Sequence, residues 1–123
     1  MTLADLKKQI KGDLFTDAAH RILYATDASA YRELSLAVTR PRDNDDIREI
    51  ISYARSQGLS VIPRGAGTSV AGQVVGKGIV IDISRYMNNI IEFNPAERWV
   101  KVQPGVVLAE LNRFLAPYNL QFG

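Results

Sequence analysis

Apolar residues recur at three- and four-residue spacing in several parts of the chain, which is the spacing of one face of an α-helix. The longest such face consists of Ile47, Ile50, Ile51 and Ala54. Asp43 or Asn44 is the expected cap of this helix, because a short side-chain oxygen accepts hydrogen bonds from the free N–H groups of the first turn. Gly58 suits the left-handed position at which many helices end. The pattern therefore predicts a helix between residues 43 and 58.

Three shorter segments show the same helical spacing. The first covers residues 3–11 and ends at Gly12, the second runs from Thr16 as its cap to Leu23, and the third covers residues 108–115 before Pro117. Between the second of these and the next strand, small and polar residues from Tyr24 to Ser29 predict an ordered loop.

Apolar runs bounded by turn residues predict five strands. They cover residues 34–39, 60–64, 78–83, 90–94 and 99–102. The first two flank the longest predicted helix, so they are expected to be parallel strands of a βαβ unit with a right-handed crossover. The third run is almost entirely apolar and is expected to be buried. Together the elements predict an α+β fold with a small mixed or parallel sheet flanked by helices.

The composition fits one globular domain, with 123 residues of which 46% are hydrophobic. The net charge is +2 and the Lys and Arg residues are scattered along the chain, so no nucleic-acid partner is expected. The absence of cysteine excludes disulfides, thiol nucleophiles and thiolate metal sites. The charged start of the chain shows no long apolar run, so neither a signal peptide nor a membrane span is expected, and a cytoplasmic location is the default.

The candidate chemistry lies in a glycine-rich stretch that follows the second predicted strand, at residues 64–73. Gly65 and Gly67 lack a Cβ, so their backbone can adopt positive φ and approach a ligand closely. Successive backbone N–H groups in such a loop form a concave nest that suits an anion. Arg64 adds positive charge, and the loop also carries the hydroxyls of Thr68 and Ser69. The pattern suits a diphosphate, although a tight glycine turn with solvent-facing hydroxyls would use the same residues.

Two well-known phosphate motifs do not fit this loop. A Walker loop needs Gly-Lys-Ser/Thr, whereas Gly67 is followed by Thr68 and Ser69. The dinucleotide fingerprint needs a third glycine three residues after the second, and that position is Val70. A different nucleotide-binding geometry is therefore required.

Four sequence features, taken in order, resemble the FAD-binding domain of the vanillyl-alcohol oxidase and p-cresol methylhydroxylase family. They are Arg40-Pro41 before a helix, the stretch from Pro63 to Gln73, the end of a strand at Asp82-Ile83-Ser84, and Val102 to Val106 before a helix. The branch that looks most similar is the D-lactate and glycolate dehydrogenase type. The resemblance spans residues 35–123.

This resemblance implies which residues hold the cofactor. It assigns Arg64, Gly65, Ala66, Gly67, Thr68 and Ser69 to the FAD diphosphate, places Gly72 and Gln73 beside it, and puts the Pro104-Gly105 turn near the adenosine half. Some relatives attach FAD through a histidine where this chain has Thr68, so non-covalent FAD is expected. The single histidine, His20, is expected to be structural rather than catalytic.

Asp82 and the segment before residue 35 each have a structural interpretation and a functional one. Asp82 can serve a pocket, but a capping or turn role is favoured. The segment from Tyr24 to Arg32 resembles one that packs near the flavin entrance in one subgroup, and for Tyr31 and Arg32 plain packing and surface roles are the favoured alternative. No residue is a convincing catalytic acid or base.

The resemblance also implies an organisation and an activity. Residues 1–34 are expected to form a helical lead-in, and residues 35–123 the first subdomain of an FAD-binding domain that continues beyond Gly123. The implied reaction of the parent is oxidation of a 2-hydroxy acid to a 2-oxo acid, with the fragment alone inactive and prone to self-association. The alternatives are a nucleotide- or phosphate-binding module without redox activity, and a structural module whose glycines serve only turns.

Overall fold

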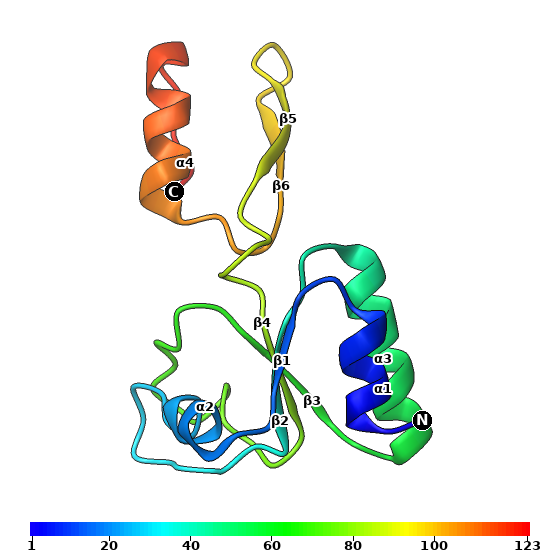
Figure 1. The fold of residues 1–123 in the computed structure, drawn as a ribbon. Helices are drawn as coiled ribbons and strands as arrows, with labels where there is room; N and C mark the ends of the chain where they lie inside the picture. The colour runs from blue at the N-terminus through cyan, green and yellow to red at the C-terminus, as the bar shows by residue number, and fades with distance from the viewer.

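Four strands form a mixed sheet in the order β1-β2-β4-β3. In the computed structural model, which describes residues 1–123, β4 pairs in parallel with β2 and β3, whereas β1 is antiparallel to β2. A mixed sheet flanked by helices was expected, and this prediction is confirmed (Figure 1). The strands are β1 (Asp13–Phe15), β2 (Ala37–Arg40), β3 (Val61–Arg64), β4 (Ile79–Asp82), β5 (Ile90–Asn94) and β6 (Trp99–Val102).

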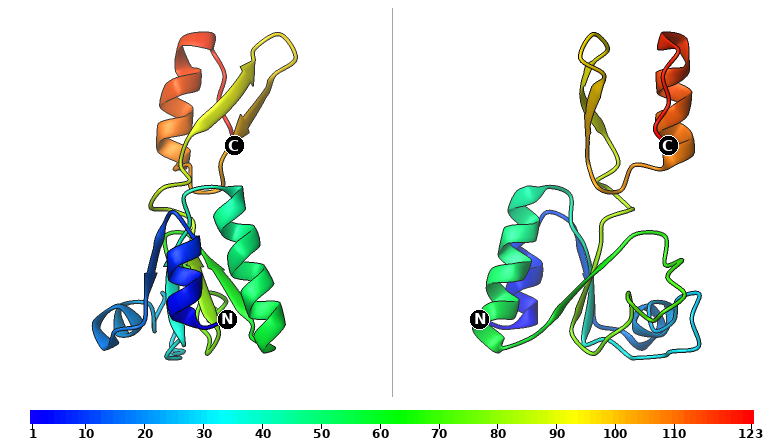
Figure 2. Two further views of the ribbon diagram at one scale, coloured as in Figure 1. Left: turned by 45° about the vertical axis from the view of Figure 1, so that its right-hand side comes forward. Right: turned by 180° about the vertical axis from the view of Figure 1, so that it is seen from behind.

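Helices cover the sheet on both faces. Figure 2 shows α1 and α3 side by side on one face, and α2 with its loops on the other. The helices are α1 (Leu3–Gln9), α2 (Ala18–Leu23), α3 (Asn44–Gln57) and α4 (Leu108–Leu115), and a 3-10 turn (Ala116–Tyr118) follows α4. None of them combines the length and the apolar content that crossing a membrane requires.

Strand β4 is the centre of the sheet, and all four of its residues are buried. It lies between β2 and β3, which are therefore parallel to one another without being neighbours. Ile79, Val80 and Ile81 are apolar on successive positions because helices or loops cover both faces of β4. The burial expected for this run is confirmed.

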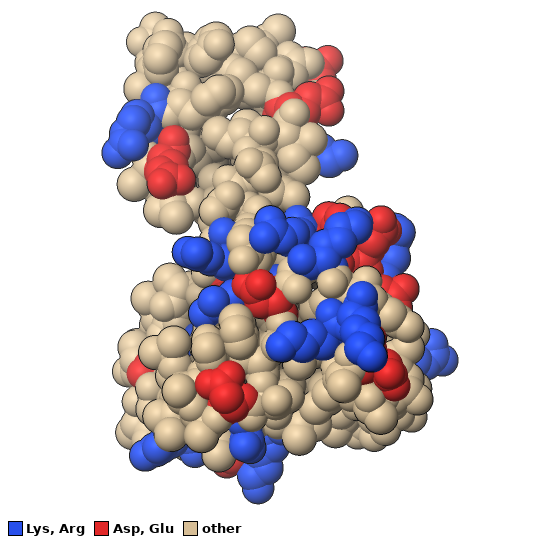
Figure 3. All heavy atoms as spheres, in the orientation of Figure 1, with Lys and Arg blue, Asp and Glu red and all other residues tan.

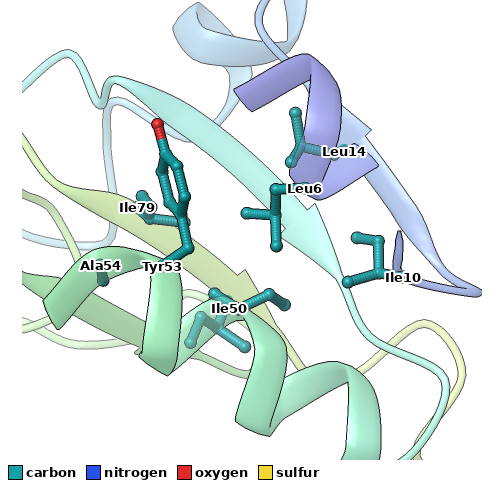
Figure 4. Packing of buried hydrophobic residues seen from close by; sticks show 8 residues of the cluster. Leu6, Ile10, Leu14, Ile50, Tyr53, Ala54 and Ile79 are labelled. Carbon is teal, nitrogen blue, oxygen red and sulfur yellow. The ribbon is translucent and has the colours of Figure 1, made fainter. Parts of the chain in front are cut away.

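The main core lies between the sheet and the pair of helices α1 and α3. Figure 4 shows Leu6 and Ile10 facing Ile50 and Tyr53 across this space. Each apolar side chain buried in such a core stabilises the fold by about 1.5–3 kcal/mol. The buried members of this cluster are Leu6, Ile10, Leu14, Ile50, Tyr53, Ala54, Ile79 and Ile81.

The first 34 residues are more than the helical lead-in expected from the sequence. Asp13–Phe15 form strand β1, which was not predicted because three residues are too few to show a period. Leu14 reaches the core only through pairing with Thr39 of β2. The cap of α2 is Asp17 rather than Thr16, because its carboxylate accepts from the N–H of His20 at 3.1 Å.

Asp46 joins two backbone segments through one buried carboxylate. Its oxygens accept from the N–H groups of Lys11 (2.8 Å), Gly12 (2.9 Å) and Arg42 (2.9 Å). Gly12 must lack a side chain here, because a Cβ would lie 2.0 Å from the carbonyl oxygen of Arg40. Asp43 caps α3 by accepting from the Asp46 N–H at 3.0 Å, and Gly58 ends the helix with φ 64°, as expected.

The strands β5 and β6 form a hairpin beyond the sheet, with α4 packed beside it (Figure 1). Both strands and the helix have the residue ranges that the sequence predicts. Three aromatic rings join the hairpin to its helix: Phe93 meets Phe114 edge-on at 5.4 Å and Tyr118 at 4.8 Å between ring centroids. The hairpin and α4 therefore form a second, smaller apolar unit.

Replacing Asp46 by alanine is expected to destabilise the fold by about 3 kcal/mol or more, because three N–H groups lose a charged acceptor and each unsatisfied buried group costs about 1–3 kcal/mol. The urea unfolding midpoint measures this change. Asp45→Ala is the matched control, since Asp45 lies on the same turn with its side chain 71% exposed. Equal midpoints for the two variants would contradict the role given to Asp46.

Candidate functional site

The carboxyl ends of β2, β3 and β4 meet at one edge of the sheet, where parallel α/β sheets commonly bind ligands. Arg40 ends β2 and Arg64 ends β3, the two strands that flank β4. Asp82 ends β4, opposite Arg64. The chain leaves this edge from β3 into the glycine-rich stretch and from β4 toward the hairpin (Figure 1). The topology therefore brings the predicted loop to the start of the hairpin unit.

The backbone of the glycine-rich loop presents its N–H groups without protein partners. No N–H from residue 65 to residue 70 donates a hydrogen bond to another group of the chain, whereas those of Ala71 and Gln73 both donate to the Ser69 hydroxyl at 3.3 Å. Gly67 turns the chain with φ 72°. An anion-binding nest requires free N–H groups of this kind beside a left-handed residue.

The three glycines of the loop differ in what surrounds them. A Cβ on Gly67 would lie 2.5 Å from Nη2 of Arg64, and one on Gly72 would lie 2.7 Å from the ring of Tyr31. A Cβ on Gly65 would meet nothing within 4 Å, and this residue has no positive φ. The left-handed φ favours glycine at Gly67 and Gly72, where a Cβ would also push a neighbouring side chain aside, whereas Gly65 has open space around it.

The hydroxyl groups of the loop divide into two kinds. Ser69 donates to the side-chain oxygen of Gln73 at 2.8 Å while accepting from the backbone beyond it. Its proton is therefore engaged in shaping the loop. Thr68 is exposed, so its hydroxyl is the one that faces solvent beside the free N–H groups.

The Arg64 side chain packs against the glycine-rich loop and does not extend into solvent. Its Nη1 donates to the carbonyl oxygens of Tyr24 (3.3 Å) and Val74 (3.4 Å), and its guanidinium carbon lies 5.2 Å from the centroid of the Tyr24 ring. Val74 closes the far end of the glycine-rich stretch. One side chain thus connects the start of the loop, its end and the segment after α2.

Asp82 is buried at this edge of the sheet, with 6% of its surface exposed, and accepts several hydrogen bonds. It accepts from the Ser84 N–H (2.9 Å), the Ser84 hydroxyl (2.6 Å) and the Tyr24 hydroxyl. Burial, and then donation to Asp82, raise the pKa of Tyr24 above its usual value. The turn role favoured for Asp82 is confirmed, and the contribution of Tyr24 was missed because nothing in the sequence signals a contact between residues this far apart.

The predicted adenosine-side turn lies next to the same strand end. A Cβ on Gly105 would lie 2.3 Å from the carbonyl oxygen of Ile83, whose own N–H donates to Arg64 at 3.1 Å. The Gly105 N–H donates to Met87 at 2.8 Å. Pro104 lines a cavity of about 490 Å³ between α3 and the hairpin. The fold therefore places the 64–73 and 104–105 segments on either side of Ile83.

Two other predicted residues have packing roles. His20 stacks on Phe15 with ring centroids 3.7 Å apart, and its Nδ1 lies 2.8 Å from the Asp17 carboxylate, so it is structural, as expected. Tyr31 covers Gly72 while remaining 64% exposed.

Basic side chains that are scattered in the sequence gather in space on one face. Figure 3 shows them where the sheet unit meets the hairpin unit, with acidic side chains among them. Arg42 and Arg85 both pack on one tyrosine, with their guanidinium carbons 4.0 and 5.9 Å from the centroid of the Tyr86 ring. The mixture of signs at this junction agrees with the small net charge of the chain.

Residues 35–123 match the family described as the FAD binding domain. This chain belongs to that family. The match includes the whole glycine-rich loop and the Pro104-Gly105 turn. FAD is therefore the cofactor of the domain, and the family expected from the sequence is confirmed.

Curated relatives of this FAD-binding chain are dehydrogenases and oxidases. It is 44% identical to D-2-hydroxyglutarate dehydrogenase of Haemophilus influenzae, over 98% of this chain and 12% of that protein. It is 37% identical to a mitochondrial cytochrome-type D-lactate dehydrogenase of Kluyveromyces lactis, over 70% of this chain and 16% of that protein. The chain thus spans a small part of the length of these relatives.

The fold of this FAD-binding chain recurs in solved structures. p-Cresol methylhydroxylase with bound substrate matches with a TM-score of 0.81 at 12% identity, over 96% of this chain and 24% of that one. Alkyldihydroxyacetonephosphate synthase matches with a TM-score of 0.80 at 20% identity, over 94% of this chain and 26% of that one. At such identities the likeness concerns the fold.

The raised pKa of Tyr24 gives a prediction about alkaline pH. Stability that comes from its neutral phenol is complete below the ordinary tyrosine pKa of about 10 and is lost as pH rises through the higher folded pKa. Phenolate absorbance of the folded chain is expected to show a component that titrates at higher pH than an ordinary tyrosine and that Tyr24→Phe removes. Tyr31→Phe, which removes an exposed phenol, should leave that component in place, and its loss there would contradict the assignment.

Proposed function

We propose that the loop after β3 binds the FAD diphosphate through its backbone. The supporting observation is the run of N–H groups at residues 65–70 that have no protein acceptor, around the left-handed Gly67. A pyrophosphate supplies the anionic acceptors that such a run needs. The open space at Gly65 gives the ligand a close approach to the backbone.

In this proposal the site residues have different tasks. Gly65, Ala66, Gly67 and Thr68 contact the diphosphate, and Arg64, Ser69, Gly72 and Gln73 hold the loop around it. Pro104 and Gly105 border the adenosine half. The cofactor is held without a covalent bond, because Thr68 offers no suitable nucleophile for one.

We further propose that the parent protein oxidises a 2-hydroxy acid to a 2-oxo acid. Relatives named for D-2-hydroxyglutarate, D-lactate and glycolate support this class, since all three compounds are 2-hydroxy acids. When bound, FAD supplies the redox chemistry, and the chain described here binds and orients it. The cytoplasmic location and the division at residue 34 stay predictions.

Titration of the chain with FAD and with ADP tests the diphosphate site. Both ligands are expected to bind, because they share the diphosphate and the adenosine. A nucleotide-binding module without redox activity would bind both with affinities that do not depend on the flavin. A structural module, whose glycines serve only turns, would bind neither.

Gly67→Val is expected to abolish the binding of both ligands. A β-branched residue at φ 72° is strained, and its Cβ would collide with Arg64. Val70→Ala is the matched control, because Val70 belongs to the same loop and is 79% exposed. Calorimetric titration of both variants measures the effect, and undiminished binding by Gly67→Val would exclude this loop as the site.

We also propose that the isolated chain associates with itself at high concentration. The β5–β6 hairpin has only its own two strands, so both outer edges are open. Ile91 is 56% exposed and Trp99 is 40% exposed on these strands. Light scattering is expected to show a mass that rises with concentration, and Ile91→Lys should reduce that rise. A monomer at every concentration would contradict the proposal.

A further inference from the structure

We propose that Arg64 is a positioning residue: its guanidinium sets the shape of the nucleotide-binding loop from below and does not act as a ligand of the phosphates. This inference rests on the proposed function for what the loop binds. It concerns the task of one residue within that site. The observation behind it is the direction of the Arg64 side chain.

Arg64 connects the two ends of the glycine-rich loop. Nη1 of Arg64 donates to the carbonyl oxygen of Val74 at 3.4 Å, so the side chain at the start of the stretch holds its end. The same nitrogen donates to the carbonyl oxygen of Tyr24 at 3.3 Å. Both protons of that nitrogen are thereby directed to the protein's own carbonyl groups.

Arg64 also packs against Gly67 in the middle of the loop. Nη2, Cζ and Nε of Arg64 lie 2.5, 3.0 and 3.1 Å from the place where a Cβ on Gly67 would stand. The flat guanidinium therefore lies directly against the residue with positive φ. A Cβ at this position would push the guanidinium aside, and the positive φ itself favours glycine, so the left-handed turn and the guanidinium pack against each other.

The Arg64 side chain is itself held in place by Tyr24. The Tyr24 ring lies 5.2 Å from the guanidinium carbon, and its hydroxyl donates to the buried Asp82 at the end of β4. Arg40 also donates to that hydroxyl, from Nε at 3.2 Å. Contacts thus run from the end of β4 through Tyr24 to Arg64, and from Arg64 to the glycine-rich loop.

The shape of arginine is essential to this role. A planar fork can reach two carbonyl groups while lying flat under a glycine, whereas the ammonium of lysine is a point charge on a flexible stem. A phosphate ligand, in contrast, needs mainly the charge. Substitution of Arg64 by lysine therefore distinguishes a residue that supports the loop from one that binds the phosphates.

The experiment compares Arg64→Lys and Arg64→Gln with the unchanged 123-residue chain, in two measurements. The first is the backbone order parameters of residues 65–70 by ¹⁵N relaxation without nucleotide. In both variants they are expected to fall from the rigid value of about 0.85 to below about 0.6. The second is FAD affinity, which is expected to fall about tenfold or more in both, as the fraction of chains with a competent loop falls to about a tenth.

Arg55→Gln is the matched control. It removes one positive charge from the last turn of α3, where Arg55 is exposed, and it should change neither the loop nor the affinity. An equal loss of affinity in this variant would show that net charge, not the Arg64 geometry, governs binding, and would overturn the proposal.

Two further results would overturn it. One is an affinity restored by Arg64→Lys, because charge alone would then suffice. The other is a loop that stays rigid in Arg64→Gln while FAD is lost, because Arg64 would then be a phosphate ligand. If the loop loosens in Arg64→Gln and the unchanged chain binds no FAD, the positioning role stands and the proposed function fails.

Discussion

The burial of β4 between two parallel strands is the constraint on which the rest of the structure depends. Because all four of its residues are buried, its carboxyl end is fixed relative to the core, and that end carries Asp82 and Ile83. Asp82 holds Tyr24, which supports Arg64 and through it the glycine-rich loop. The backbone of Ile83 contacts Arg64 on one side and Gly105 on the other. The loop and the hairpin unit are both positioned from this one strand end.

Two buried carboxylates organise the polar parts of the fold. Asp46 collects the backbone N–H groups that lead out of α1 and β2, and Asp82 collects the groups around the site edge. Each is acceptable in a buried place because donors surround its oxygens, and a buried polar group without partners would be costly. The contrast with the loop is direct: its backbone N–H groups from residue 65 to residue 70 have no such partner.

The site itself was predicted from the sequence only in part. The glycines and hydroxyls of residues 64–73 identified the loop, because such residues permit the backbone conformations that an anion nest needs. The orientation of Arg64 was not predictable, because a charged side chain beside a phosphate loop suggests a ligand as readily as a support. The role of Tyr24 was not predictable either, because its contacts with Asp82 and Arg64 join residues far apart in the chain.

The sequence by itself determined the local elements and the family. Helical spacing placed α3 and α4, apolar runs placed β3 to β6, and caps and glycines set the ends of α3, because these are interactions between residues close in the chain. Only the tertiary structure decided the strand order, the existence of β1 and the separation of β2 from β3 by β4. Those features come from pairing between distant segments, whose burial and hydrogen bonds exist only once the chain has folded.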